Sequence, residues 1–177
     1  MELKELTRDE VLYIMPLAKK RVDKYLPYIN KYAQIYGVTT TLRMAHFLAQ
    51  IAQESAQLQY VREIASGEKY EGRKDLGNTV KGDGVRYKGR GLIQITGKAN
   101  YKAVSKALGV DFVAHPEKLE EAEYAVASAF WYWKSHGCNE IADLNDSVKV
   151  TRRINGGTNG LDDRLRYLGR AKMVFQI

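Results

Sequence analysis

A single carboxylate lies within an apolar helix pattern in the first third of the chain. In the stretch TLRMAHFLAQIAQES, residues 41–55, Met44, Phe47 and Ile51 recur at the spacing of one helix face, and Glu54 falls on that same face. Apolar surroundings disfavour a charged carboxyl group, so a glutamate in this position can hold its proton near neutral pH and act as a general acid. The spacing is equally compatible with a glutamate at the edge of the stripe whose head group reaches water.

The other reactive residue types give weaker signals. Cys138 is the only cysteine, which excludes an internal disulfide and fits a chain folded in a reducing compartment. His136 lies close to it in the sequence, but such a pair is more typical of a helix end than of a nucleophile with its base. No Cys, His, Asp and Glu cluster has the spacing of metal ligands. We therefore expect neither a metal nor a cofactor.

The net charge of +7 is unevenly distributed. Residues 72–102 carry eight Lys/Arg against two Asp, and residues 147–177 carry seven against two acids, whereas residues 116–146 carry seven acids against two bases. This asymmetry favours an anionic partner, such as nucleic acid, a membrane face or an anionic polymer. A surface charged only for solubility is the alternative.

Length and composition favour one domain over residues 1–177, without a separate binding module. A chain of 177 residues with 45% hydrophobic content can bury a sizeable core. The longest apolar run, AVASAFWYW, is far shorter than the roughly 20 residues that span a bilayer. The N-terminal MELKELTRDE has no apolar segment, so we expect no secretory signal peptide.

Helical periodicity covers most of the first sixty residues. A capping box at Thr7 to Glu10 predicts a short helix that is interrupted near Pro16. Residues 17–36 continue in helical period, with Pro27 marking a break or a fresh start. Thr39 to Thr41 offer caps for the helix that carries Glu54.

The rest of the chain alternates between a glycine-rich region and further helices. Residues 64–91 contain seven glycines in 28 positions, which predicts loop with short strands at most and, at this length, a functional surface. Helices are expected over residues 97–109, 116–137, 146–156 and 161–175, and the second of these should be the buried central one. The prediction is a mainly α fold with six to eight helices and a small irregular β region.

Three motifs in order resemble glycoside hydrolase family 19. They are AHFLAQIAQES, YKGRGLIQITGKANY and RINGGTNGLDDR, and the resemblance covers roughly residues 39–175. The single cysteine and the segment YEGRKDLGNTVKGDG make the chain more similar to the bacteriophage endolysins of this family than to its plant chitinases. The resemblance implies a lysozyme-like α+β fold with two lobes around a cleft, and inverting hydrolysis of β-1,4 bonds in a polymer that contains N-acetylglucosamine.

The resemblance also implies a pair of catalytic carboxylates. Glu54 matches the general acid of the family, although Gln53 stands where the family usually has a histidine. The base lies nine residues after the acid in endolysins of this kind, at Glu63. Glu68 and Glu71 are alternatives for this role, and an ordinary surface ion pair is the other interpretation of Glu63.

Helix geometry turns this assignment into a structural prediction. Nine residues of one straight helix would separate Glu54 and Glu63 by about 13.5 Å of rise and place them on opposite faces. Inverting enzymes need carboxyl groups about 6.5–9.5 Å apart, with room for the attacking water. The helix must therefore end between about Ala56 and Arg62, and the chain must fold back.

Thr96 matches the family's Ser/Thr that helps to hold the catalytic water. A second interpretation is that Thr96 caps the helix that follows it. The resemblance also implies substrate contacts, through aromatic rings that stack on sugars and polar groups that bind hydroxyl and N-acetyl groups; the matching positions are Tyr87, Gln94, Asn100, Tyr101, Asn155 and Arg164. Each has a structural alternative: Tyr101 above all could pack in its helix, and Asn155 could belong to a turn.

The favoured function is that of a phage-type endolysin that cleaves peptidoglycan, with N-acetylmuramidase as the favoured specificity and host cell lysis as the outcome. A chitinase acting on N-acetylglucosamine polymers is the alternative. A non-catalytic wall-binding module or a basic nucleic-acid-binding module fits less well, since no helix-turn-helix or RNA-binding signature is present, and we expect no nucleic-acid partner. We expect a monomer that stays in the host cytoplasm until a separate pore-forming protein releases it to the wall. The basic C-terminal helix could contact anionic outer-membrane or wall polymers.

Overall fold

The structure is a computed structural model that describes all of the chain, Met1–Ile177. Nine α-helices follow one another: α1 (Arg8–Ile14), α2 (Val22–Ile35), α3 (Thr41–Glu54), α4 (Asp83–Arg86), α5 (Lys98–Leu108), α6 (Ala122–Ser135), α7 (Cys138–Asp143), α8 (Ser147–Asn155) and α9 (Leu161–Phe175). Four short 3₁₀ helices lie between them: η1 (Pro16–Ala18), η2 (Glu68–Tyr70), η3 (Lys74–Leu76) and η4 (Pro116–Glu120). None of the helices combines the length and the apolar character that crossing a membrane requires.

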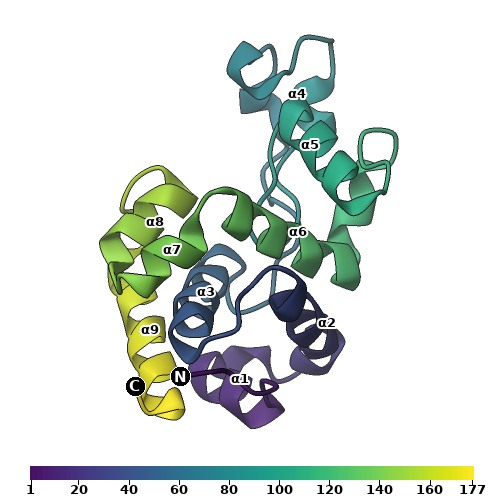
Figure 1. Cartoon of the computed structure of the whole chain (residues 1–177). Coiled ribbons are helices and arrows are strands. Elements are labelled where there is room, and N and C mark those ends of the chain that lie inside the picture. The colour runs from purple at the N-terminus through teal and green to yellow at the C-terminus, as the bar shows by residue number, and fades with distance from the viewer.

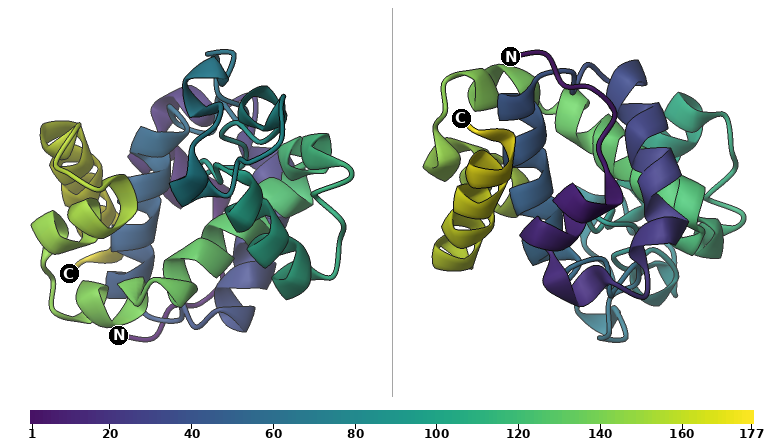
Figure 2. Two further views of the ribbon diagram at one scale, coloured as in Figure 1. Left: turned by 90° about the horizontal axis from the view of Figure 1, so that it is seen from above. Right: turned by 90° about the horizontal axis from the view of Figure 1, so that it is seen from below.

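The helices form two lobes that share α6 (Figure 1). The larger lobe contains α1, α2, α3, α7, α8 and α9, and the smaller lobe contains α4, α5 and the long loops around them. Helix α9 runs alongside α3 in both views of Figure 2. The predicted fold class, mainly α with two lobes, is confirmed.

The core of the larger lobe is built around α3 and α6. Phe47 of α3 stacks on Phe130 of α6 with ring centroids 4.0 Å apart, and Trp133 meets Phe47 edge-on at 5.4 Å. All three side chains are fully buried. Each contributes about 1.5–3 kcal/mol through burial. The stretch 125–133 thus forms the buried central helix that the sequence predicts.

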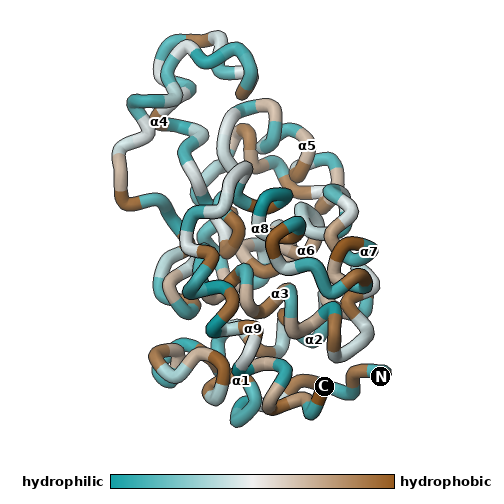
Figure 3. The backbone as a smooth tube through the Cα atoms, turned by 90° about the vertical axis from the view of Figure 1, so that its left-hand side faces the viewer, coloured by the Kyte–Doolittle hydropathy of each residue, from teal (hydrophilic) through white to brown (hydrophobic).

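The smaller lobe has its own small core of six buried residues: Tyr87, Ile95, Tyr101, Val104, Phe112 and Leu119. Helix α6 also contributes to this core, through Tyr124, Trp131 and Tyr132. Because one helix packs into both cores, the two lobes are tied together along α6. The segment around α4 is mostly hydrophilic along its length, unlike the central helices (Figure 3).

Several helix ends follow the predicted signals. The Thr7 hydroxyl accepts from the Glu10 amide at 3.2 Å, and the Glu10 carboxylate accepts from the Thr7 amide at 2.9 Å, which is the complete capping box. Thr40 caps α3 by accepting from the Arg43 amide at 3.1 Å. Helix α9 covers residues 161–175 as expected.

Three helix predictions are wrong. Residues 64–91, predicted as loop with short strands at most, contain the helical turns η2, η3 and α4. Pro27 does not break its helix, because α2 continues from Val22 to Ile35 around it. The proline costs about 3 kcal/mol in a helix interior, and the buried side chains of Tyr25 and Ile29 on the same helix outweigh that cost. The helix expected at 116–137 is split, since η4 ends at Glu120, Glu121 is extended, and α6 starts afterwards.

The β region is reduced to three isolated bridges. They pair Glu2 with Thr40, Arg62 with Arg90, and Arg90 with Ile95. The last two bridges share Arg90, at the end of the glycine-rich segment. They set the path of the chain beside the end of α3.

Candidate active site

Helix α3 ends at Glu54, slightly earlier than the predicted window of Ala56 to Arg62. The next turn is left-handed, with φ of 49° at Ala56, 60° at Gln57 and 66° at Leu58. Non-glycine residues adopt this conformation at a cost of roughly 1–2 kcal/mol each. The turn reverses the chain, as the geometry of a shared cleft requires.

Buried contacts hold this strained turn in place. The Ser55 hydroxyl donates to the Ile51 carbonyl at 2.5 Å and accepts from the Leu58 amide at 2.9 Å. The Gln57 side chain accepts from the Leu17 amide at 2.9 Å and donates to the Tyr167 hydroxyl at 3.1 Å. Since Leu58 itself is fully buried, the turn is anchored to the core as well as by hydrogen bonds.

The returning chain places Glu63 against the glycine-rich segment. The Glu63 amide donates to the Gly89 carbonyl at 2.8 Å, and the Gly91 amide donates to the Val61 carbonyl at 2.8 Å. The Gly89 amide in turn donates to Glu63 Oε2 at 3.0 Å. Backbone and carboxylate of Glu63 are therefore both fixed by the segment 89–91.

Glu54 and Glu63 line the same cavity. It measures about 320 Å³ and is also lined by Tyr60, Arg62 and Gln94, among others. The Glu54 side chain is 18% exposed and the Glu63 side chain 15%, so both carboxylates are largely shielded while reaching the cavity. The structure brings together the two carboxylates that the sequence assigns as acid and base.

Glu54 is held from behind by a buried guanidinium. Arg164 Nη2 donates to Glu54 Oε1 at 2.8 Å, and Arg164 Nη1 donates to Gln50 Oε1 at 2.6 Å. Gln50 also donates to the Thr151 hydroxyl at 3.2 Å. The Arg164 side chain is only 3% exposed. A buried charge pair of this kind fixes the orientation of the carboxyl group rather than adding much stability.

Glu63 is held by a different set of donors. The Tyr70 hydroxyl donates to Glu63 Oε1 at 2.9 Å, and Lys69 Nζ lies 3.6 Å from the same oxygen. Burial raises the pKa of Tyr70, and the bond to Glu63 raises it further. Tyr70 therefore stays protonated and serves as a donor to the carboxylate at neutral pH.

A buried network braces the segment that carries Gly89. Arg90 Nε donates to Glu120 Oε2 at 2.9 Å, and its Nη1 donates to the Tyr101 hydroxyl at 2.9 Å and to the Arg86 carbonyl at 2.7 Å. The Tyr101 hydroxyl donates to the Lys88 carbonyl. These contacts position the backbone on which the Glu63 carboxylate depends.

Thr96 lies beside Glu54 in a second, smaller cavity. This cavity measures about 170 Å³, and Gln94 and Asn100 also line it. The Thr96 hydroxyl donates to the Gln94 carbonyl at 3.0 Å and does not cap α5. The buried Asn78 side chain accepts from the Lys98 amide at 2.9 Å instead. The helix-cap interpretation of Thr96 is wrong, and its oxygen can accept a bond from water.

Three proposed substrate contacts are placed elsewhere by the structure. Tyr101 is fully buried in the small core, so it cannot stack on a sugar. Tyr87 is 3% exposed, packs edge-on against Tyr101 at 5.1 Å and donates to the Val113 carbonyl at 2.9 Å. Arg164 is buried behind Glu54. The assignment of Tyr101 and Arg164 as direct sugar contacts is wrong, because packing within the lobes covers them. Tyr87 lines neither cavity of Glu54 and borders a different cavity in the smaller lobe.

The remaining predicted contacts are accessible. Gln94 lines both cavities that Glu54 lines, and Asn100 lines the smaller one. Asn155 is exposed at the end of α8 but lines neither cavity; its neighbour Ile154 does. Substrate binding by Gln94, Asn100 and Asn155 stays a prediction.

The alternative bases lie outside the cavities of Glu54. Glu71 accepts from the amides of Gly82 at 2.8 Å and Gly84 at 2.9 Å, and these bonds hold the pKa of Glu71 below its usual value. Glu68 is exposed at the start of η2. Glu63 is therefore the one of the three that faces Glu54.

Two residues of the site have no sequence signal as functional residues. Tyr70 lies in the glycine-rich loop, and only the fold brings it to Glu63. Tyr132 lines the smaller cavity beside Glu54, although its surrounding sequence is that of a core helix. Its pKa is raised, first by burial and then by the nearby Cys138 and Glu54.

Gln53 takes the place of the usual family histidine. It packs against Gly160 of the C-terminal motif, RINGGTNGLDDR. A Cβ added at Gly160 would lie 2.5 Å from Gln53 Nε2, so only glycine fits there with this rotamer.

Cys138 is buried, and burial raises the pKa of its thiol to about 12. A thiol in that state is not a nucleophile at neutral pH.

Comparison with known proteins identifies the family of the chain. The sequence profile of the glycoside hydrolase family 19, described as "Chitinase class I", matches residues 49–142, just over half of the chain. A "Glycosyl hydrolase family 19 domain-containing protein" of Haemophilus influenzae is 50% identical over 113 residues, which is 63% of this chain and 54% of that protein. "Endochitinase CHI" of Arabidopsis thaliana is 32% identical over 121 residues, covering 64% of this chain and 43% of that protein.

Solved structures show the same fold. A chitinase C mutant superposes with a TM-score of 0.76 at 20% identity, covering 97% of this chain and 92% of that chain. A class IV chitinase of this family from Zea mays gives a TM-score of 0.62 at 22% identity, with 97% and 80% coverage. The chain spans about half the length, or less, of the curated relatives it matches. From the profile match over the motifs that carry Glu54 and Glu63, the chain belongs to glycoside hydrolase family 19.

Proposed function

We propose that the protein hydrolyses β-1,4 glycosidic bonds in bacterial peptidoglycan with inversion, as an endolysin. The observation that carries this proposal is that Glu54 and Glu63 line one cavity from opposite sides of a reversed chain. Two carboxylates around one cavity are the arrangement that acid and base catalysis of glycoside hydrolysis requires.

Each carboxylate has one task in this reaction. Glu54 donates its proton to the leaving glycosidic oxygen as the C–O bond breaks. Glu63 removes a proton from water, and the water oxygen forms the new bond at the anomeric carbon from the opposite face. Thr96 accepts a hydrogen bond from that water. Tyr70 and the Gly89 amide hold Glu63 in place throughout.

The basic surface favours peptidoglycan as the substrate. The net charge of +7 attracts the anionic cell wall. Chitin is the second candidate, since relatives such as the one from Arabidopsis thaliana are described as endochitinases. Cleavage after N-acetylmuramic acid, which makes the protein a muramidase, belongs to the peptidoglycan proposal.

Product analysis tests both candidates. Purified peptidoglycan and N-acetylglucosamine oligomers are digested, the new reducing ends are identified by mass spectrometry, and their anomeric configuration is followed by NMR. Release of inverted N-acetylmuramic acid ends from peptidoglycan is the expected result. Cleavage of the oligomers alone would make the protein a chitinase.

Two variants and a control connect the products to the site. Glu54→Gln and Glu63→Gln are each expected to reduce hydrolysis about 10²–10⁴-fold, the usual contribution of general acid or base catalysis. Glu68→Gln, in the same loop region but exposed, is the matched control. Retained activity in Glu54→Gln would overturn the mechanism.

The proposal includes where the protein acts: it is stored in the host cytoplasm and is later released to the cell wall. The endolysin is a monomer that accumulates in the host cytoplasm and reaches the wall through a separate pore-forming protein. Cells that produce the protein alone should keep growing, and co-production of a pore-former should cause lysis. Lysis without a pore-former would contradict the storage step.

A further inference from the structure

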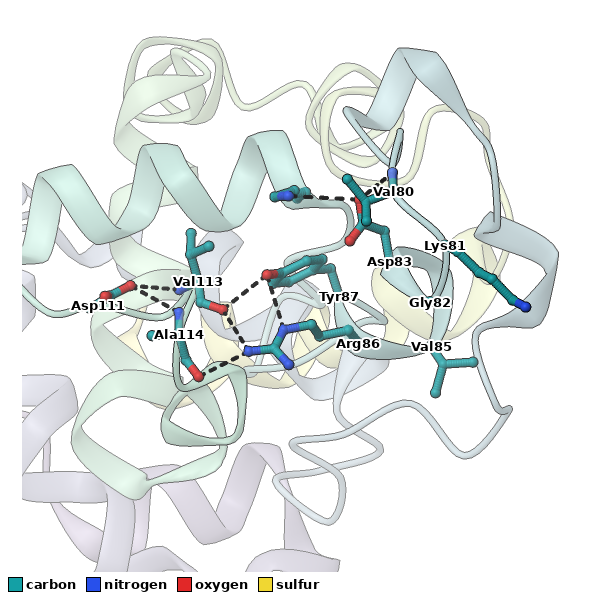
Figure 4. Close-up of a pocket in the computed structure, with 11 residues that line it drawn as sticks. Val80, Lys81, Gly82, Asp83, Val85, Arg86, Tyr87, Asp111, Val113 and Ala114 are labelled. Atoms are coloured by element: carbon teal, nitrogen blue, oxygen red, sulfur yellow. Dashed lines mark hydrogen bonds and ion pairs between the residues drawn. The ribbon is translucent and has the colours of Figure 1, made fainter.

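A cavity in the smaller lobe lies apart from the two cavities that Glu54 lines. It measures about 720 Å³ and lies between α4, the first residue of α5 and residues 111–114 (Figure 4). None of its eleven lining residues lines either Glu54 cavity. It is therefore a separate site with its own chemistry.

The acidic groups of this cavity already have partners. The buried Asp83 accepts from the Val80 amide at 3.0 Å, and Lys98 Nζ lies 3.9 Å from the same carboxylate oxygen. Asp111 accepts from the amides of Val113 at 3.1 Å and Ala114 at 3.0 Å. Both carboxylates thus maintain the shape of the cavity.

The basic groups retain free donors. Arg86 lies along the cavity and donates to the carbonyls of Val113 and Ala114 and to the Tyr87 hydroxyl, but it meets no carboxylate (Figure 4). Its Nη1 makes no hydrogen bond. Lys81 forms no ion pair, although its charge acts on the nearby Glu71 carboxylate. Three basic side chains face two acidic ones. A planar guanidinium with a free edge fits a carboxylate.

The position of the cavity relative to Glu54 indicates which part of a substrate could bring a carboxylate to Arg86. Lys98 and Asn100, two residues apart in the first turn of α5, line this cavity and the smaller Glu54 cavity respectively. A helix with its side chains is about 10–12 Å wide. An extended peptide of about five or six residues spans up to about 18–20 Å, which is comparable to the path halfway around such a helix.

We propose that this cavity binds a carboxylate of the peptide that branches from the glycan strand of peptidoglycan. Arg86 pairs with the carboxylate, and Val85 and Val113 contact small apolar side chains of the peptide. Lys81, whose side chain points away from the Arg86 guanidinium (Figure 4), adds positive charge on the other side of the cavity. This inference rests on the proposed function, because it explains how one site could prefer a peptide-bearing glycan. Chitin has no such branch and would leave the cavity empty.

Binding is tested first, without any need for hydrolysis. Muramyl dipeptide, an N-acetylmuramic acid with a short acidic peptide, is titrated into ¹⁵N-labelled protein at millimolar concentration, and tri-N-acetylglucosamine is titrated in parallel. Muramyl dipeptide should shift the Arg86 Nε–H and Gly82 amide signals, and the sugar trimer should not. No shift at Arg86 with muramyl dipeptide would overturn the inference.

Kinetics then connect the cavity to substrate choice. The readout is the ratio of KM for glycan strands freed of peptide by an amidase to KM for intact peptidoglycan. Arg86→Gln should lower this ratio by about tenfold or more, as expected for one charge-assisted hydrogen bond. Lys81→Glu should lower it by about twofold to fivefold, as expected for one exposed charge. Lys81→Glu breaks no hydrogen bond of the structure, so it keeps the test valid if Arg86→Gln misfolds.

A matched control removes the general effect of charge. The double variant Lys102→Gln with Lys106→Gln lowers the charge by the same amount as Lys81→Glu, on exposed positions of α5 outside the cavity. It should leave the KM ratio unchanged. An equal fall of the ratio in the control would show that only overall charge matters and would overturn the inference.

The two proposals can fail separately. If muramyl dipeptide shifts Arg86 but no glycan is hydrolysed, the proposed function fails and the peptide site stands. If peptidoglycan is hydrolysed but the KM ratio is the same in the wild type and in Lys81→Glu, the function stands and the peptide site fails.

Discussion

Arg164 Nη2 lies 2.8 Å from Glu54 Oε1, and this contact joins the start of α9 to the last residue of α3. The same guanidinium donates to Gln50, one turn earlier on α3. Arg164 therefore reaches the site by positioning the carboxylate rather than by contacting the sugar. Arg164 is a positioning residue for Glu54.

Replacing Arg164 with methionine should harm both stability and activity. The change leaves Glu54 and Gln50 without their shared donor, and loss of one partner of a buried pair costs on the order of 3 kcal/mol. Chemical denaturation measures the stability change, and kcat on peptidoglycan should fall with little change in KM. Arg164→Lys keeps the charge but loses the two-pronged contact, so it should recover stability in part and kcat less. A wild-type kcat in either variant would refute the positioning role.

The left-handed turn after α3 gives a prediction about backbone strain. Ala56 has a φ of 49°, which glycine adopts without steric cost. Ala56→Gly should therefore leave the free energy of unfolding unchanged or raise it by up to about 1 kcal/mol. Ala107→Gly, at an exposed position inside α5, is the control and should lower it by about 0.5–1 kcal/mol. Equal destabilisation in both variants would show that the turn is not strained.

The hydroxyl of Thr96 should matter for hydrolysis but not for folding. Thr96→Val keeps the shape and removes the group that accepts a bond from water, so kcat should fall about tenfold, the value of one hydrogen bond of about 1.4 kcal/mol. Thr96→Ser should restore most of the rate. Thr96→Ser should unfold at nearly the wild-type temperature, and Thr96→Val should lose at most about 1 kcal/mol, the value of its hydrogen bond to the Gln94 carbonyl. If Thr96→Val unfolds the protein, the hydroxyl has a structural role instead.

The sequence predicts the reversal after Glu54 but not how the chain achieves it. The reversal follows from geometry, because two carboxylates nine residues apart on one helix cannot share a cleft. The turn itself has no glycine or proline, and Ala56, Gln57 and Leu58 carry no local signal for φ above zero. Contacts with Leu17 and Tyr167, far away in the sequence, stabilise it.

The mistaken substrate contacts have a similar cause. A motif identifies which residues belong to a site, but not whether they face the ligand or support residues that do. Tyr101 and Arg164 are buried because other elements cover them, and no local pattern reports such coverage. For Thr96 it is the structural interpretation that fails: Asn78, from a loop distant in the sequence, caps α5 in its place.

His46 gives a prediction about pH. Its imidazole is fully buried on α3, its Nε2 lies 2.9 Å from Asn145 Oδ1, and its Nδ1 has no hydrogen-bond partner. Burial lowers the pKa of His46 below 6.5; the nearby Lys172 lowers it too, while Asn145 and Asp146 oppose the shift. The unfolded chain thus binds a proton more readily than the folded protein does.

The sign of the effect follows from linkage. Because the folded state has the lower pKa, the free energy of unfolding should fall as the pH drops below about 6.5 and stop falling once it passes the folded pKa. Chemical denaturation of the wild type at about pH 7.5 and at about pH 5, above and below the pKa of an unperturbed histidine, measures this loss. His46→Leu removes the titrating group, so its stability should depend less on pH over the same range. His115→Gln, at an exposed site, should keep the wild-type dependence. If His46→Leu loses stability with acid as steeply as the wild type, the buried imidazole is not the group responsible.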